Sequence, residues 1–248
     1  MMTHEEILEV FFDRIYENDI HEKMLDDIDF IIPVDRVANF VQGVIAVPYR
    51  EFLSYLDNFQ SNDIKSCDIT QCSSFKACSE DICYALFDDE NRGKTFVEIG
   101  QSPIFESYIK VPGHVAWTKY GENQVKTASQ LGLAFDYYDM WYLSCFGYVF
   151  LDLLPEDRCA FLARTLLRNP LYADIMRHIR SSSLDLAQYM SDLKPSTQGR
   201  RSVSVIQLLR VCFAEMDRSG LHYYDVHYPY YKQGEGLIRK CLKGTIVE

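Results

Sequence analysis

The sequence predicts a mainly α protein with small β-wings, and three observations carry that prediction. Apolar residues recur at helical spacing through most of the 248 residues. A polar helix that Gly132 is expected to end is followed by two short aromatic strands, at residues 135–138 and 141–143. A second helix-turn-helix pattern occupies residues 183–210. We therefore expect tandem winged helix-turn-helix units behind a helical N-terminal region.

Composition excludes several classes of protein. Hydrophobic residues make up 48% of the chain, which is enough for a folded core and argues against disorder. The sequence has no run of about 18 apolar residues, and its first residues lack the pattern of a signal peptide. We expect a cytoplasmic protein with no membrane contact, whose eight cysteines are reduced thiols.

Charge is divided unevenly along the chain, whose net charge is −11. Residues 1–154 hold 11 basic and 26 acidic side chains, whereas residues 155–248 hold 14 basic and 10 acidic ones. A basic C-terminal part suits DNA binding. The acidic N-terminal half suits a contact with a protein partner or with the basic part of the same chain.

We expect three consecutive parts. Residues 1–90 form a helical N-terminal region with a cysteine cluster, residues 91–180 the first winged-helix domain, and residues 181–248 the second helix-turn-helix or winged-helix unit. In the first part, Ile7, Leu8, Phe11 and Phe12 form one apolar stripe, and a helical stretch over residues 34–59 is broken near Pro48.

Four cysteines lie close together in the sequence, with the spacing C-x4-C-x5-C-x4-C. Four thiolates can hold zinc in a tetrahedral site, and an iron–sulfur cluster uses the same ligands. Packing as small buried hydrophobes is the alternative interpretation. The candidate metal ligands are Cys67, Cys72, Cys78 and Cys83.

In the first winged-helix domain we expect a short strand over residues 94–101, a helix over residues 104–109 and then the recognition helix. Its apolar positions share one face, which leaves the polar ones for a DNA groove. The candidate DNA-binding residues of this helix are Asn123, Gln124, Lys126, Thr127 and Gln130.

A long helix should begin at Pro155, with Arg158, Arg164 and Arg168 on a solvated or phosphate-tracking face. Pro170 should restart the chain into another helix that ends near residue 180. The second recognition helix is expected over residues 198–210, capped by Ser196 or Thr197. Its polar first turns supply the candidate DNA contacts Thr197, Gln198, Arg200, Arg201 and Ser204.

Five segments together resemble the winged-helix region of bacterial proteins classed as type II restriction enzymes of uncharacterised subfamilies. They are residues 95–101, the run Lys119-Tyr-Gly-Glu-Asn, and residues 127–133, 161–170 and 197–203. The resemblance covers roughly residues 94–210 and implies DNA recognition in a restriction or phage-defence setting.

No nuclease signature accompanies this resemblance. Glu98 with Asp88 or Asp89 would suit a metal-dependent nuclease, but the Glu-x-Lys pattern is absent after Glu98. The leading hypothesis is a non-catalytic DNA-binding protein that acts as a specificity or regulatory component of a restriction, phage-defence or transcription system. The alternatives are a metal-dependent restriction-type nuclease and a winged-helix adaptor that binds protein.

Overall fold

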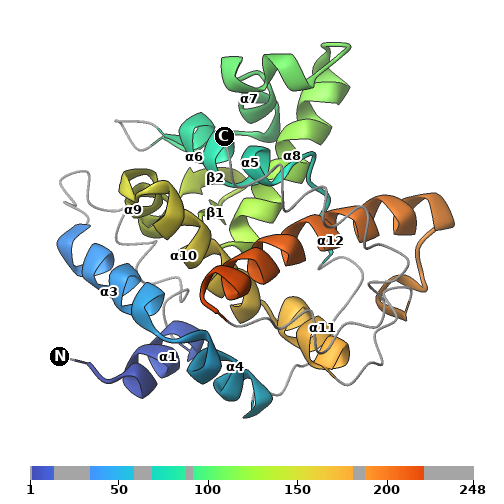
Figure 1. Cartoon of the computed structure of the whole chain (residues 1–248). Coiled ribbons are helices and arrows are strands. Elements are labelled where there is room, and N and C mark those ends of the chain that lie inside the picture. Colours follow the sequence, from blue (N-terminus) through green and yellow to red (C-terminus); the bar gives the residue numbers. More distant parts are fainter. Residues whose placement is uncertain (1, 14–33, 59–68, 88–91, 181–187, 221–248) are drawn as a thin grey trace. The chain divides into compact units, whose positions relative to one another are not determined.

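The computed structural model describes residues 2–13, 34–58, 69–87, 92–180 and 188–220 (Figure 1). Within these ranges the chain is mainly helical and contains one small antiparallel sheet of two strands, as predicted. No helix in the described ranges is long and apolar enough to cross a membrane.

The chain divides into two compact units. Unit 1 comprises Met1–Ala46 and Thr70–Arg158, and unit 2 comprises Val47–Ile69 and Cys159–Glu248. Each unit is built from two separated stretches of chain rather than from the consecutive parts expected with boundaries near residues 90 and 180. Helix α10 (Pro155–Arg168) begins in unit 1 and continues in unit 2.

The remaining elements can be assigned to one unit each. Unit 1 contains α1 (His4–Asp13), α3 (Val34–Ala46), α5 (Phe75–Cys78), α6 (Glu80–Leu86), α7 (Phe96–Gly100), η2 (Pro103–Tyr108), α8 (His114–Gln130), β1 (Ala134–Tyr137), β2 (Met140–Leu143) and α9 (Cys145–Asp152). Unit 2 contains α4 (Tyr49–Asn58), α11 (Pro170–Arg180), η3 (Gln188–Met190) and α12 (Pro195–Arg218).

Several local predictions are confirmed. The apolar stripe of α1 is buried, and the helical stretch of residues 34–58 is interrupted between α3 and α4, at Pro48. A proline disfavours the α conformation in the residue before it, which explains the break. The helices expected to begin at Pro155 and Pro170 do so. Proline suits a helix start because the first N–H groups have no partner within the helix.

The strand predicted over residues 94–101 is wrong. Lys94 alone pairs, in an antiparallel bridge with Trp141, and α7 begins directly afterwards. Thr95 and Glu98 form a capping box: the Thr95 hydroxyl accepts from the Glu98 N–H, and the Glu98 carboxylate accepts from the Thr95 N–H. This exchange satisfies donors that a helix start otherwise leaves open, so it favours a helix over the alternating strand pattern.

Helices α7 and α8 pack closely in unit 1, as Figure 1 shows. Two glycines permit the approach. A Cβ at Gly121 would lie 2.1 Å from the Phe96 carbonyl oxygen, and one at Gly100 would lie 2.1 Å from the Trp117 carbonyl oxygen. No real Cβ can take these positions, so the two backbones meet at a distance that requires glycine on both helices.

Gly132 ends α8, as predicted. It has a φ of 71°, and the N–H groups of Gly132 and Leu133 donate to the carbonyls of Ser129 and Ala128. This pattern is the Schellman motif, which satisfies the last carbonyls of a helix. The chain then enters β1, which pairs with β2 from Ala134 opposite Leu143 to Tyr137 opposite Met140.

The start of the second predicted recognition helix needs correction. Helix α12 begins at Pro195, and the Thr197 and Gln198 N–H groups both donate to the Lys194 carbonyl. Ser196 and Thr197 therefore lie inside the first turn and do not cap it. Proline favours the first helical position, which explains the earlier start. Of the helix predicted before it, only residues 188–192 lie within the described ranges.

Candidate nucleic-acid interface

Helix α8 presents one continuous exposed face. Val115, Lys119 and Lys126 are exposed, and their spacing of four and seven residues places them on the same side of the helix. Asn123 and Gln130 are half-buried at the edge of this face. Lys119 was not among the predicted contacts, although its spacing of seven from Lys126 is readable in the sequence. We call Val115, Lys119 and Lys126 the exposed face of α8.

An ion pair partly neutralises this face. The Lys126 ammonium lies 2.6 Å from a carboxylate oxygen of Glu122, one turn earlier on α8. It also lies 5.7 Å from the centre of the Phe96 ring, at a distance suited to a cation–π contact. Both side chains of the ion pair are partly exposed, so the pair stabilises the fold weakly and Lys126 can exchange partners at little cost.

A second polar stripe of α8 is covered by residues 70–73, which we call the covering segment. Thr127 donates to the Thr70 hydroxyl over 2.9 Å, and Thr70 donates to the Gln130 side chain over 2.9 Å. The Ser73 N–H donates to the Gln124 side-chain oxygen over 3.4 Å. These bonds join residues more than fifty positions apart in the sequence.

Two predicted DNA contacts are consequently buried. Gln124 is 1% exposed and Thr127 is 0% exposed, and the covering segment takes up their hydrogen-bonding groups. Neither side chain faces a surface where a groove could lie, so the prediction for these two residues is corrected. Their polar groups form hydrogen bonds with the covering segment. Asn123, Lys126 and Gln130 keep at least partial exposure.

The hairpin between β1 and β2 has an aromatic tip. Tyr138 and Asp139 form its two-residue turn, with φ values of 46° and 62°. Positive φ at both positions is what a type I′ hairpin turn requires. Tyr138 is 84% exposed, and its ring meets that of Tyr137 edge-on with the centroids 4.5 Å apart. The tip therefore presents a large amphipathic side chain to any surface that approaches the hairpin.

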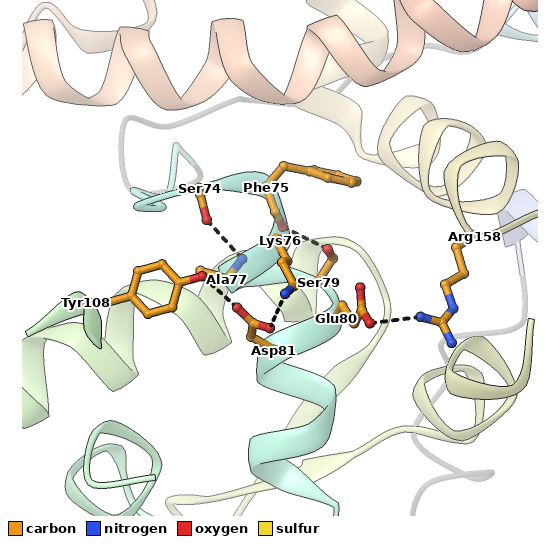
Figure 2. Close-up of polar contacts among 9 residues, drawn as sticks. All are labelled: Ser74, Phe75, Lys76, Ala77, Ser79, Glu80, Asp81, Tyr108 and Arg158. Atoms are coloured by element: carbon orange, nitrogen blue, oxygen red, sulfur yellow. Dashed lines mark hydrogen bonds and ion pairs between the residues drawn. The ribbon is translucent and has the colours of Figure 1, made fainter. Parts of the chain in front are cut away.

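A buried carboxylate fixes the segment that precedes α8. Figure 2 shows Asp81, at the start of α6, accepting a 2.9 Å hydrogen bond from the Tyr108 hydroxyl of η2. Asp81 is 6% exposed, and the Lys76 ammonium lies 3.7 Å from its other oxygen. Burial, and next the Asp81 carboxylate, raise the pKa of Tyr108 above its ordinary value, so the phenol stays a donor.

The surroundings of Asp81 are structural. Ser74 caps α5 by accepting from the Ala77 N–H, the Ser79 hydroxyl donates to the Phe75 carbonyl, and Arg158 pairs with Glu80 over 3.1 Å (Figure 2). The first two bonds close the two ends of α5, and the third joins α6 to the first turn of α10. The cluster has the polar groups of an acid–base site, but they are used to hold α5, α6 and η2 together.

Two tyrosines extend this arrangement to α8. The Tyr120 ring lies 5.9 Å from that of Tyr108 and 5.1 Å from that of Phe105, and its hydroxyl is 2.8 Å from the Ser73 hydroxyl. Burial raises the pKa of Tyr120 to about 12. The phenol therefore remains protonated at neutral pH and acts as an anchor for the covering segment.

Three of the four predicted metal ligands lie in the described ranges, and all three are buried. The Cys78 thiol donates to the Phe75 carbonyl over 3.3 Å. Burial, and next a hydrogen bond with Cys72, raise the pKa of Cys78, and burial raises the pKa of Cys83. Among the described residues no group of three or more potential ligands is placed to hold a metal ion. Cys67 lies outside the described ranges, so the four-cysteine site stays a prediction.

In unit 2 the start of α12 exposes fewer of the predicted contacts than expected. Arg200 is exposed, Arg201, Thr197 and Gln198 are half-buried, and Ser204 is 2% exposed. The Gln198 amide donates to the carbonyls of Met190 and Leu193, both over 2.9 Å, and so holds the preceding turn. Ser204 is corrected to a core position.

Comparisons of the chain with known protein families, curated proteins and solved structures found no match. The functional argument therefore depends on the geometry of the chain itself.

Proposed function

We propose that unit 1 is a winged helix-turn-helix module that binds double-stranded DNA through α8 and the β1–β2 hairpin. The order of its elements supports this proposal: α6, the Lys94 bridge, α7, α8, β1 and β2 follow one another along the chain. The backbone of Lys94 also pairs with Trp141 of β2, in an isolated one-residue bridge just before α7. A pair of helices followed directly by a β-hairpin is the order of elements expected of a winged helix-turn-helix.

Because residues 1–154 are acidic as a whole, the proposal depends on one local feature, the exposed face of α8. Two lysines seven residues apart lie on it, and the carboxylate beside them, that of Glu122, is paired with Lys126. A helix with lysines along its open side suits the phosphate-lined major groove of a duplex. Tyr138 at the hairpin tip is available for a contact with the backbone or the minor groove.

The resemblance to restriction-enzyme winged-helix regions supports a specificity or regulatory role in a restriction, phage-defence or transcription system. We propose this role without cleavage. Glu98, the acidic residue considered for a nuclease, accepts from both the N–H and the hydroxyl of Thr95 over 2.7 Å. Its carboxylate is therefore used to start α7, which argues against the metal-binding role.

The test is fluorescence anisotropy with labelled duplex DNA across a salt series. We expect binding that weakens with salt, because neutralising phosphates releases counterions. Replacing Lys119 and Lys126 together by alanine should weaken binding. It should also make the slope of log affinity against log salt shallower, by about 0.9 for each phosphate that the variant no longer neutralises. Arg36→Ala together with Arg50→Ala removes the same two charges from exposed positions of α3 and α4 and is the matched control.

Two outcomes would contradict the proposal. If replacing Arg36 and Arg50 weakens binding as much as replacing the two lysines, overall charge rather than α8 drives association. If the protein binds no duplex at low salt, unit 1 is not a DNA-binding module, and protein binding through the same surface becomes the working hypothesis. An apolar protein interface would show little dependence on salt.

A further inference from the structure

Val115 is an apolar side chain on the exposed face of α8. It is the second residue of α8, 66% exposed, and lies on the same face as Lys119, one turn further on. Val111, which precedes the helix, is 77% exposed. The start of the helix therefore exposes two valines together with His114, and the lysines follow toward the C-terminal end.

We propose that Val115 contacts the C5 methyl group of a pyrimidine in the major groove, so that α8 selects sites with a methylated pyrimidine opposite its first turn. The inference rests on the proposed function, because it assigns a base-reading role within the same DNA surface. Thymine carries this methyl group in ordinary DNA, and 5-methylcytosine carries it in modified DNA. The shared chemistry is an apolar contact between a valine and a methyl group.

The placement of the charges favours this contact. The first turns of a recognition helix are the part that reaches base edges, whereas lysines further along hold phosphates. The Val115 side chain can form no hydrogen bond with a phosphate, so its share of a DNA interface must come from apolar contact. In the major groove the C5 methyl is the apolar group displayed by the base pairs.

The residues around Val115 leave its side chain open. The covering segment contacts the stripe that holds Tyr120, Gln124 and Thr127, and the glycine contact with α7 lies at Gly121. Val115 lies on neither of these sides, since Lys119, Glu122 and Lys126 follow it at spacings of four, seven and eleven residues. Among the described residues of unit 1, none of these contacts covers the side of α8 on which Val115 lies, so a base edge can approach it there.

The experiment uses the full chain and a duplex selected for binding from a random pool. Each thymine is replaced in turn by uracil, which lacks only the C5 methyl, and each cytosine by 5-methylcytosine. For the protein as it is, we expect at least one position where removing the methyl weakens binding about three- to fivefold, the effect of one buried methyl-sized group. An effect at a thymine or at a methylcytosine tells which base supplies the methyl.

Variants make the assignment to Val115 specific. Val115→Ala keeps only one methyl-sized group, so it should lose most of the difference between the thymine and uracil duplexes at that position, and the two changes should be non-additive. Val203→Ala, at an exposed valine of α12, should keep the full difference. Because Val115 is exposed and alanine favours helices, the variant is expected to fold.

The outcomes separate the inference from the proposed function. Salt-dependent binding that is equal for thymine and uracil at every position overturns the methyl contact and leaves DNA binding intact. A methyl preference that persists in Val115→Ala also overturns it, because another residue then reads the methyl. Absence of binding to any duplex overturns the proposed function itself.

Discussion

Lys94 and Trp141 exchange two backbone hydrogen bonds, each with an N to O distance of 2.9 Å, in an antiparallel bridge. The Lys94 ammonium also donates to the Ala85 carbonyl over 2.6 Å, in the last turn of α6. One residue therefore joins the end of α6 to the edge of the β1–β2 hairpin. This junction sets the position of the hairpin relative to the helices that precede α8.

Replacing Lys94 by methionine should loosen that junction. The apolar stem is kept, but the Ala85 and Phe87 carbonyls are left without a charged donor. We expect a decrease of about 1–2 kcal/mol in the free energy of unfolding, at the lower end for a charged hydrogen bond because Lys94 is half-buried. Tryptophan fluorescence during urea unfolding is a suitable readout, because both tryptophans, Trp117 and Trp141, lie in unit 1.

Lys110→Met is the matched control, since Lys110 is exposed in the same unit. It should change the free energy of unfolding by no more than about 0.5 kcal/mol, as most surface changes do. If both variants lose equal stability, the bond between Lys94 and α6 contributes nothing of its own.

The capping box at Thr95 predicts a pH dependence. Two hydrogen bonds from Thr95 lower the pKa of Glu98 below its ordinary value of 4.5. A carboxylate with a lower pKa in the folded state stabilises above its unfolded pKa, and this stabilisation is lost as the pH falls through the folded pKa. Glu98→Gln should therefore be less stable than the unchanged protein at pH 7 but not at acid pH.

The size of this effect should be modest. Glu98 is exposed, so solvent screens its charge, and a difference of about a few tenths of a kcal/mol is expected at neutral pH. Thermal unfolding of the two proteins between neutral pH and about pH 3.5 measures it. A stability difference that grows as the pH falls would contradict this prediction. It would mean that the Glu98 carboxylate does not stabilise the start of α7.

Arg164 is a buried cation whose removal should destabilise unit 2. Its guanidinium donates to the Val47 carbonyl over 2.8 Å and lies 4.0 Å from the centre of the Tyr49 ring. Burial lowers its pKa below the ordinary value and raises the pKa of Tyr49. Arg164→Ala should cost about 2–4 kcal/mol in the free energy of unfolding, because it removes both the hydrogen bonds and the stacking on the ring.

Arg164→Met should cost less than Arg164→Ala, because methionine fills most of the volume and brings no charge into the core. Circular dichroism during urea unfolding compares the two with Arg200→Ala, an exposed arginine of α12 that should change little. If Arg164→Ala and Arg200→Ala lower the free energy of unfolding equally, the buried contacts of Arg164 contribute no more to the stability of unit 2 than an exposed arginine does.

The sequence predicted the elements that local chemistry decides. Pro48 separates α3 from α4, and Gly132 ends α8, because each acts through its own backbone. The strand predicted over residues 94–101 failed although its contrary signal was present, since Thr95 and Glu98 have the spacing of a capping box. In this segment the cap decides the structure, and the alternation of apolar residues does not.

The candidate site depended on contacts that are distant in the sequence. Gln124 and Thr127 have the polarity of groove-reading residues, and only the covering segment, more than fifty residues earlier, turns them into buried partners. Arg164 looked like one of three solvated arginines, but the Val47 carbonyl it binds is 117 residues away. Periodicity reports which face of a helix is polar, and it cannot report which polar face another segment covers.

The cysteine cluster makes a separate prediction about metal. If Cys67 completes a site with Cys72, Cys78 and Cys83, the purified protein should contain about one zinc ion per chain by mass spectrometry of its metals. Zinc would hold these thiols as thiolates, against the burial that otherwise keeps Cys78 and Cys83 protonated.

Cys83→Ser should then lose the metal, whereas Cys145→Ser, outside the cluster, should keep it. Absence of zinc, with no effect of a chelator on the melting temperature, would make the cluster a packing feature.

Replacing Glu122 should strengthen DNA binding, whereas replacing the lysines of α8 should weaken it. It holds the Lys126 ammonium at 2.6 Å, so Glu122→Gln removes a negative charge beside the exposed face of α8 and frees Lys126 for phosphate. We expect tighter binding to duplex DNA at low salt, with a slope of log affinity against log salt that is steeper by about 0.9 if Lys126 then neutralises one phosphate.

Glu5→Gln removes the same charge from the exposed side of α1 and serves as control. Equal increases in affinity for both variants would show an effect of net charge alone. An increase confined to Glu122→Gln, and abolished when Lys126 is also replaced by alanine, would assign the added phosphate binding to that lysine.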